Sequence, residues 1–343
     1  MAEIDDAPVL QVRGLKTHFF TDQGRVPAVD GIDLEIAQGR TLGLVGESGC
    51  GKSVTGLSIM RLIARPGKIV AGEVLLRGEN LLKLPEREMR VRRGGEIGMI
   101  FQEPMTSLDP LFPISDPIVE ALRAHRRVTS REALKQATAL LADVGIPDPE
   151  RRIRSYPHEL SGGMRQRVMI AVALSCRPAV LIADEPTTAL DVTVQAQILA
   201  LQRELQREHG TAILLITHNL GLVAENCDTV AVMYAGKVVE RAPKRSLFRG
   251  PRHPYTQGLL RAVPRLDHPP KQPLVTIPGI VPNPLRLPAG CRFRARCPWA
   301  IGKCAEEEPP LMAVGEAHAS ACWVQPEFAA APPTVAGAKG AAA

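Results

Sequence analysis

Residues 46–53 read Gly-Glu-Ser-Gly-Cys-Gly-Lys-Ser and match the pattern G-x-x-x-x-G-K-[ST], typical of loops that bind nucleotide phosphates. An apolar run at 41–45 predicts a strand before this loop, and residues 54–63 predict a helix after it. The glycines let backbone N–H groups point at phosphate oxygens, Lys52 can reach the outer phosphates, and the Ser53 hydroxyl can hold Mg²⁺. An ordinary glycine-rich turn is the alternative, against which the strand and helix argue. The expected phosphate contacts are Gly46, Glu47, Ser48, Gly49, Cys50, Gly51, Lys52, Ser53 and Val54.

Polar side chains follow three other apolar runs that predict buried strands. The run at 97–101 ends at Gln102, the run at 180–183 ends at Asp184 and Glu185, and the run at 212–216 is followed by Thr217 and His218. Asp184 suits a metal ion and Glu185 suits activation of an attacking water. Gln102 can reach a metal or that water, although a lone glutamine is more often a loop residue. A lone histidine is likewise more often structural.

The remaining patterns predict an α/β chain with a helical insertion. Strands at 9–12 and 32–36 suggest an antiparallel layer, and another strand is expected at 72–76. Phe19 lies between the first two, either as a platform for an adenine ring or as a core aromatic. Residues 117–155 read as helical, with a capping box at Thr129 and Glu132. Ser161 and two glycines open a further helix, where free N–H groups can bind an anion, although Ser-Gly-Gly alone is usually a loop.

Composition limits the cellular setting. No apolar run approaches the roughly 18 residues that span a bilayer, and the acidic N-terminus lacks the features of a signal peptide. We therefore expect the protein to stay in the cytoplasm. The net charge of +6 is mild for 343 residues and favours a solvated arginine-rich surface over a nucleic-acid partner.

The order of these motifs resembles the ATP-binding subunit of ABC transporters over residues 9–250. The resemblance implies a P-loop ABC ATPase core with an antiparallel β layer, in a domain spanning 1–250, and a helical subdomain inserted at 104–163. It identifies residues 46–53 as the Walker A loop, Asp184 as the Walker B carboxylate and Glu185 as the catalytic glutamate. It implies catalytic roles for Lys52, Gln102 and His218, and metal contacts from Ser53, Gln102 and Asp184. The further nucleotide contacts that it implies are Phe19, the signature residues Ser161, Gly162 and Gly163, Gln166 and Asp191.

In this family two cassettes pair head to tail, so each ATP lies between the Walker A loop of one and the signature of the other. Residues 101–110 and 253–260 resemble the dipeptide, oligopeptide and nickel uptake ATPases. That resemblance implies a second cassette, commonly a paralogue, two membrane permease subunits and, indirectly, an extracytoplasmic solute-binding protein. We expect peptide import from the cytoplasmic face of the membrane. A nickel or other small-solute importer is the alternative, followed by a soluble ABC ATPase that acts on DNA or ribosomes.

Four cysteines lie close together in the sequence of a proline-rich C-terminal domain predicted over 251–328, before a tail at 329–343 that we expect to be disordered. They are Cys291, Cys297, Cys304 and Cys322. A cytoplasmic location disfavours disulfides, and their spacing lacks the close pairs usual for zinc. The spacing leaves open a [4Fe–4S] cluster, zinc and unliganded thiols, and the resemblance favours the cluster. We also expect neighbouring arginines at 292, 294 and 296 to lower the thiol pKa values.

Overall fold

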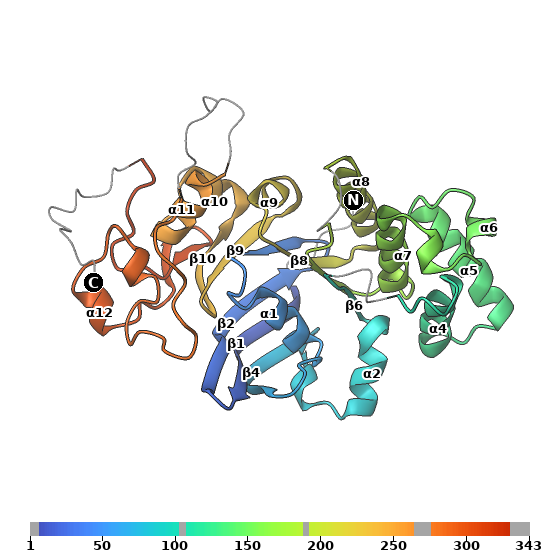
Figure 1. Ribbon diagram of the computed structural model, residues 1–343, viewed down its shortest axis with the longest axis horizontal. Coiled ribbons are helices and arrows are strands. Elements are labelled where there is room, and N and C mark those ends of the chain that lie inside the picture. The colour runs from blue at the N-terminus through green and yellow to red at the C-terminus, as the bar shows by residue number, and fades with distance from the viewer. Residues whose placement is uncertain (1–6, 103–107, 188–191, 264–275, 330–343) are drawn as a thin grey trace.

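The computed structural model describes residues 7–102, 108–187, 192–263 and 276–329. Within these ranges the chain forms two sheets, a group of helices and a C-terminal part with little regular structure (Figure 1). None of the described helices is long and apolar enough to cross a bilayer.

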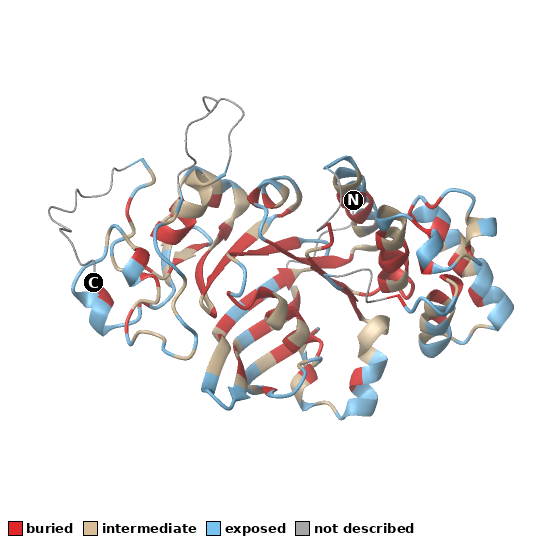
Figure 2. Ribbon diagram, viewed as in Figure 1, coloured by how far each residue is buried: buried red, intermediate tan, exposed pale blue. Residues whose placement is uncertain are grey.

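The smaller sheet is antiparallel, and its strands in spatial order are β2 (Gly24–Ala37), β1 (Pro8–Thr21), β4 (Gly67–Leu76) and β5 (Glu79–Asn80). The predicted antiparallel layer is confirmed, with Val12 opposite Leu34. Buried and exposed residues alternate along its strands, as expected for a sheet with one solvated face (Figure 2). β4 begins at Gly67 rather than at residue 72, because its pairing with β1 continues to Phe19.

The larger sheet has the strand order β11 (Met312–Gly315), β12 (His318–Ser320), β10 (Lys237–Pro243), β9 (Thr229–Tyr234), β3 (Thr41–Val45), β8 (Ala212–Thr217), β7 (Val180–Asp184) and β6 (Ile97–Ile100). Its central strands, from β9 to β6, run parallel. Every residue of β3, β6, β7 and β8 is buried, which explains why these strands read as continuous apolar runs (Figure 2). β6 stops one residue before the predicted end, and Phe101 beyond it is 38% exposed.

The remaining elements in chain order are α1 (Lys52–Ile59), η1 (Leu81–Lys83), α2 (Glu86–Gly95), α4 (Ser115–His125), α5 (Ser130–Asp143), α6 (Pro149–Arg152), η2 (Pro157–Glu159), α7 (Gly162–Leu174), α8 (Val192–His209), α9 (Leu220–Asn226), α10 (Lys244–Arg249), α11 (Pro254–Arg261), η3 (Arg294–Arg296) and α12 (Lys303–Glu306). The capping box at the start of α5 is confirmed: Thr129 accepts from the Glu132 N–H, and Glu132 accepts from the Thr129 N–H. The same helix ends just before Gly145, whose φ of +73° suits a helix terminus.

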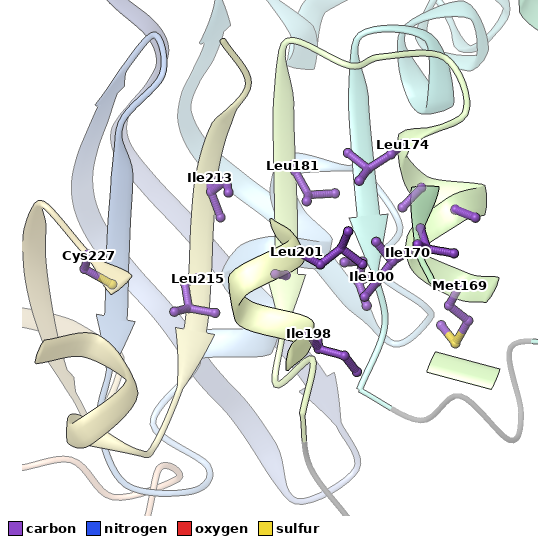
Figure 3. Close-up of a cluster of buried hydrophobic side chains, with 14 of the residues drawn as sticks. Ile100, Met169, Ile170, Leu174, Leu181, Ile198, Leu201, Ile213, Leu215 and Cys227 are labelled. Carbon is purple, nitrogen blue, oxygen red and sulfur yellow. The ribbon is translucent and has the colours of Figure 1, made fainter. Parts of the chain in front are cut away.

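Two cores lie on opposite faces of the parallel strands, since successive side chains point to opposite faces. One face packs against α7, α8 and the helical insertion through residues that include Ile100, Leu181, Leu215, Ile170 and Ile198 (Figure 3). The other face packs against α1 and the antiparallel sheet through residues that include Leu42, Leu44, Ile182, Ile216 and Leu10. The parallel strands are therefore fixed from both sides, and so are the loops that follow them.

The C-terminal part joins the larger sheet directly, because β12 pairs with β10 and places Ser320 opposite Glu240. The Glu240 side chain is fully buried and accepts hydrogen bonds from the N–H groups of Arg252 and His253 and from Nε2 of His318. The predicted boundary at residue 250 thus lies between two segments that share one sheet. Part of the predicted proline-rich stretch, at 264–275, and the tail at 330–343 lie outside the described residues.

Candidate active site

The loop at 46–53 connects the end of β3 to the start of α1, as the pattern predicts. Two of its glycines have backbone angles that disfavour other residues: φ is +157° at Gly46 and +107° at Gly51. A Cβ atom at Gly46 would lie 2.1 Å from the Met233 carbonyl oxygen, and one at Gly51 would lie 2.2 Å from that of Ala28. The loop is therefore pressed against β9 and β2, and Ser48 at its tip is exposed.

Lys52 is buried within this loop and is held by its own backbone. Its Nζ atom donates to the carbonyl oxygens of Gly46 and Glu47 at 2.8 and 3.0 Å. The ammonium group thus lies under a loop whose N–H groups and helix N-terminus already favour an anion. This arrangement suits the binding of nucleotide phosphates.

Ser53 and Asp184 form the part of the site that could hold a divalent cation. The Ser53 hydroxyl donates to Asp184 Oδ1 at 3.0 Å, which brings the first turn of α1 to the end of β7. Burial raises the pKa of Asp184 to about 6, the Glu185 charge adds to the rise, and the Ser53 hydrogen bond and Lys52 charge oppose it. A carboxylate and a hydroxyl are oxygen ligands of the kind that Mg²⁺ prefers.

Glu185 lies between two side chains that the sequence separates widely. Gln102 Nε2 donates to its Oε2 at 3.2 Å, and His218 Nδ1 lies 3.0 Å from its Oε1. The three residues follow β6, β7 and β8, which are adjacent and parallel, so their carboxyl ends bring these side chains together. Glu185 has a left-handed φ of +46°, uncommon outside glycine and frequent at functional sites. A carboxylate held in this way can take a proton from a water molecule.

The other predicted nucleotide contacts are distributed over two further places. Ser161 caps α7, with its hydroxyl accepting from the Met164 N–H at 3.3 Å, and Gln166 donates to the Pro186 carbonyl oxygen. In Figure 1, α7 lies with the helical insertion, whereas α1 and its loop lie above the antiparallel sheet. Phe19 is half-buried in β1 beside Gly67. Asp191 lies outside the described residues.

Sequence reasoning missed two residues that contact the loop from far along the chain. The Tyr255 hydroxyl accepts from the Glu47 N–H at 2.8 Å, and Arg296 binds the Glu47 carboxylate through both terminal nitrogens, at 2.6 and 2.9 Å. Tyr255 lies in a segment already distinguished by its resemblance to uptake ATPases. In the sequence, Arg296 stands out only as a neighbour of the cysteines. No spacing rule relates residue 296 to residue 47.

The four C-terminal cysteines are neighbours, and none of the chain's seven cysteines forms a disulfide. The Cys291 N–H donates to the Cys304 carbonyl oxygen at 2.9 Å, and the charges of the other thiolates contribute to the pKa of Cys297. Among the described residues, however, no three histidine, cysteine, aspartate or glutamate side chains are arranged as a metal site.

The expected lowering of the thiol pKa values by arginine is wrong. Burial raises the pKa of Cys291 and Cys322, and it raises that of Cys297 to about 12. The arginines are engaged elsewhere: Arg296 pairs with Glu47, and Arg292 pairs with Asp30 and Glu308. Desolvation of the thiols therefore outweighs the positive charges close to them in sequence.

The chain is similar to proteins of known family. The ABC transporter family model matches residues 29–188, and a model of the C-terminal region of oligopeptide and dipeptide transporters matches residues 239–304. The oligopeptide transport ATP-binding protein OppD of Salmonella typhimurium is 50% identical over 92% of this chain and 93% of its own length. The chain belongs to the ABC transporter ATP-binding family.

Other relatives extend the same finding. The oligopeptide transport ATP-binding protein AppD of Bacillus subtilis is 50% identical over 93% of this chain and 97% of its own length. A putative peptide import ATP-binding protein of Brucella ovis is 53% identical over 94% of this chain and 99% of its own length. A dimeric ATP-binding cassette, solved after hydrolysis with ADP and phosphate bound, has a TM-score of 0.63 at 26% identity and covers 69% of this chain and 99% of its own. The protein is thus an ABC ATPase, with ATP and Mg²⁺ as its expected ligands.

Proposed function

We propose that this protein is the ATP-hydrolysing subunit of a peptide importer. The observation that carries the proposal is the position of Glu185, between Gln102 and His218 and next to the Ser53–Asp184 pair. The substrate class comes from the relatives, which match nearly the whole chain. Their names specify the transport or import of oligopeptides, dipeptides or peptides. A nickel or other small-solute importer is the alternative.

In the proposed reaction Glu185 accepts a proton from the water that attacks the terminal phosphate of ATP in line. His218 and Gln102 hold the Glu185 carboxylate and the attacking water in place. Lys52 and the loop N–H groups stabilise the charge that develops on the phosphate oxygens. Ser53 and Asp184, with Gln102, would hold Mg²⁺, which supplies further charge neutralisation when bound.

We further propose that the site is completed by a second cassette. Ser161, Gly162 and Gly163 lie with the helical insertion, away from the loop of their own chain, and the first two are exposed, so they are available to a nucleotide on a partner. Gln166 is buried in the same helix, so it would reach such a nucleotide only after its side chain moves. The relative of known structure cited above is described as dimeric. Two permease subunits would receive the resulting movement at the cytoplasmic face of the membrane, and a solute-binding protein outside it would deliver the peptide.

The test combines catalysis with partner identification. Glu185→Gln should bind ATP but hydrolyse it about 100-fold or more slowly, while the unaltered chain should hydrolyse ATP faster in the transporter than alone. The tagged protein should co-purify with two multi-spanning membrane proteins, and vesicles of that complex should take up labelled dipeptides in preference to nickel. A wild-type rate for Glu185→Gln, or co-purification with ribosomes or DNA, would overturn the proposal.

For the C-terminal part we propose a small proline- and cysteine-rich domain, over 251–328, that holds a [4Fe–4S] cluster through Cys291, Cys297, Cys304 and Cys322. Four neighbouring thiols, of which Cys304 and Cys322 are buried and Cys291 and Cys297 half-buried, are the donor type that such clusters use, although the side chains do not stand in the arrangement of a metal site. Its role would be structural, because this part contains little regular structure. Protein purified without oxygen should absorb near 400 nm and contain about four irons per chain. If the absorption and the iron are both absent, the cluster proposal is refuted. The proposal that the protein hydrolyses ATP does not depend on this result.

A further inference from the structure

Glu47, the second residue of the phosphate-binding loop, is held from three directions. Its carboxylate is bound by Arg296, its N–H donates to Tyr255, and its carbonyl oxygen accepts from Lys52. Two of these partners come from the C-terminal part, beyond β10, and the third is the phosphate-binding lysine itself. The C-terminal part therefore contacts the loop that binds nucleotide.

Arg296 is built into its position. It is 7% exposed, and its Nε atom donates to the Pro278 carbonyl oxygen at 3.0 Å. Its guanidinium carbon lies 5.8 Å from the centre of the Tyr234 ring and 5.9 Å from that of Phe293. A planar guanidinium fixed on two aromatic rings presents its two terminal nitrogens to Glu47 with little freedom to turn.

Tyr255 belongs to the same assembly. It is fully buried, its ring centre lies 4.6 Å from that of Tyr234 and 5.5 Å from that of Phe293, and its hydroxyl is fixed by the Glu47 N–H. The aromatic cluster thus joins β9, α11 and the segment before η3. Both C-terminal side chains that bind Glu47, Arg296 and Tyr255, therefore belong to or pack on this one cluster.

The charge of Glu47 explains why such a contact matters for nucleotide binding. A free carboxylate in a loop that binds phosphates would repel the ligand, since like charges at short range disfavour each other. The Arg296 pair neutralises that charge. The Tyr255 hydrogen bond fixes the Glu47 peptide, whose carbonyl oxygen in turn positions Lys52.

We propose that Arg296 and Tyr255 are positioning residues through which the C-terminal part sets the affinity of the phosphate-binding loop for nucleotide. The inference rests on the nucleotide binding in the proposed function. Coupling between sites is reciprocal, so bound nucleotide also stabilises the segment around residues 291–297.

The test measures the affinity of the full-length protein for a fluorescent ATP analogue. Arg296→Ala should weaken binding roughly 3- to 30-fold, the usual range for mutations that couple two sites. Arg294→Ala, which removes an exposed charge from the same turn, is the matched control and should leave the dissociation constant unchanged. Arg296→Lys retains the positive charge but not the bidentate contact, so its dissociation constant should lie between those of Arg296→Ala and Arg294→Ala. Tyr255→Phe should also weaken binding.

Two measurements separate positioning from general damage. In a Glu47→Ala background, Arg296→Ala should have no additional effect on affinity, because the group it neutralises is gone. In the unaltered protein, ATP should slow amide hydrogen exchange across residues 291–297. In the assembled transporter, Arg296→Ala should raise the KM for ATP more than it lowers kcat.

Equal affinities for Arg296→Ala and Arg294→Ala would overturn the proposal. If Arg296→Ala does not fold, Arg296→Lys and Tyr255→Phe provide the test. Unchanged affinity for the ATP analogue in both variants would also overturn the proposal. Unchanged amide exchange at 291–297 on adding ATP would also refute it. Failure of the unaltered protein to bind the analogue would instead refute the proposed function.

Discussion

Asp184, the proposed Mg²⁺ ligand at the end of β7, lowers the stability of the free protein because its side chain is buried. The residue is 4% exposed, and its pKa is raised to about 6, chiefly by burial. The folded protein therefore holds the Asp184 proton more tightly than the unfolded chain, whose pKa is 3.8. Ionisation of Asp184 thus costs folding free energy, and the cost grows as pH rises from 3.8 to about 6.

Asp184→Asn should accordingly stabilise the nucleotide-free protein in the presence of a chelator. We expect the free energy of unfolding to rise by about 2–3 kcal/mol at pH 7.5 and the gain to disappear below pH 4. Denaturant unfolding at several pH values checks this, with Asp22→Asn in the exposed β1–β2 turn as the control. A loss of stability at pH 7.5 would mean that the Ser53 hydrogen bond outweighs desolvation.

For single residues, the sequence predicts the positions of site residues that directly follow strands. It does not predict which residues from distant segments contact the site. Gln102, Glu185 and His218 could be placed together because parallel strands align their carboxyl ends. The partners of Glu47 could not, because Tyr255 and Arg296 reach the loop through the packing of an aromatic cluster. The pKa of the cysteines was mispredicted for a related reason, since burial cannot be read from neighbouring residues.

Among the elements, those defined by short-range patterns matched their predictions best. The capping box of α5 and the runs that became β7 and β8 follow local rules of hydrogen bonding and burial. The pairing of β12 with β10 joins residues 320 and 240, and no local pattern indicates it. The start of β4 was placed too late, because its first residues depend on pairing with β1 rather than on an apolar run.

The α5 cap offers a prediction at this scale. Thr129→Ala removes the side-chain acceptor for the Glu132 N–H and the hydroxyl that donates to the Glu132 carboxylate. We expect the free energy of unfolding to fall by about 1 kcal/mol, as is usual for loss of an N-cap. Thr138→Ala, at a half-buried position in the interior of the same helix, is the control and should have a smaller effect. If denaturant unfolding gives the same loss of unfolding free energy for both variants, the N-cap makes no specific contribution to stability.

At the scale of the whole molecule, the buried Glu240 carboxylate adds to the β10–β12 pairing in joining the C-terminal part to the rest of the chain. Glu240 accepts from the N–H groups of Arg252 and His253 at 2.6 and 3.0 Å and from His318 at 2.7 Å. These three donors are directed at the Glu240 carboxylate, so its removal leaves them without that acceptor in a buried environment.

Glu240→Ala should therefore loosen the C-terminal part, at a cost of about 3 kcal/mol or more. Limited proteolysis should cleave this variant after residue 250 faster than the unaltered protein. Glu316→Ala, in the exposed turn between β11 and β12, should be cleaved at the unaltered rate. Identical digestion of all three proteins would show that the C-terminal part is held by other contacts.

The β10–β12 pairing also has a consequence for solubility. Without β12, β10 would be an edge strand whose free N–H and C=O groups could pair with another chain. The C-terminal hairpin moves that edge outward to β11, which spans only Met312–Gly315. Very short edge strands offer little for a second molecule to extend. The segment that follows the cassette thus also guards it against sheet-to-sheet aggregation.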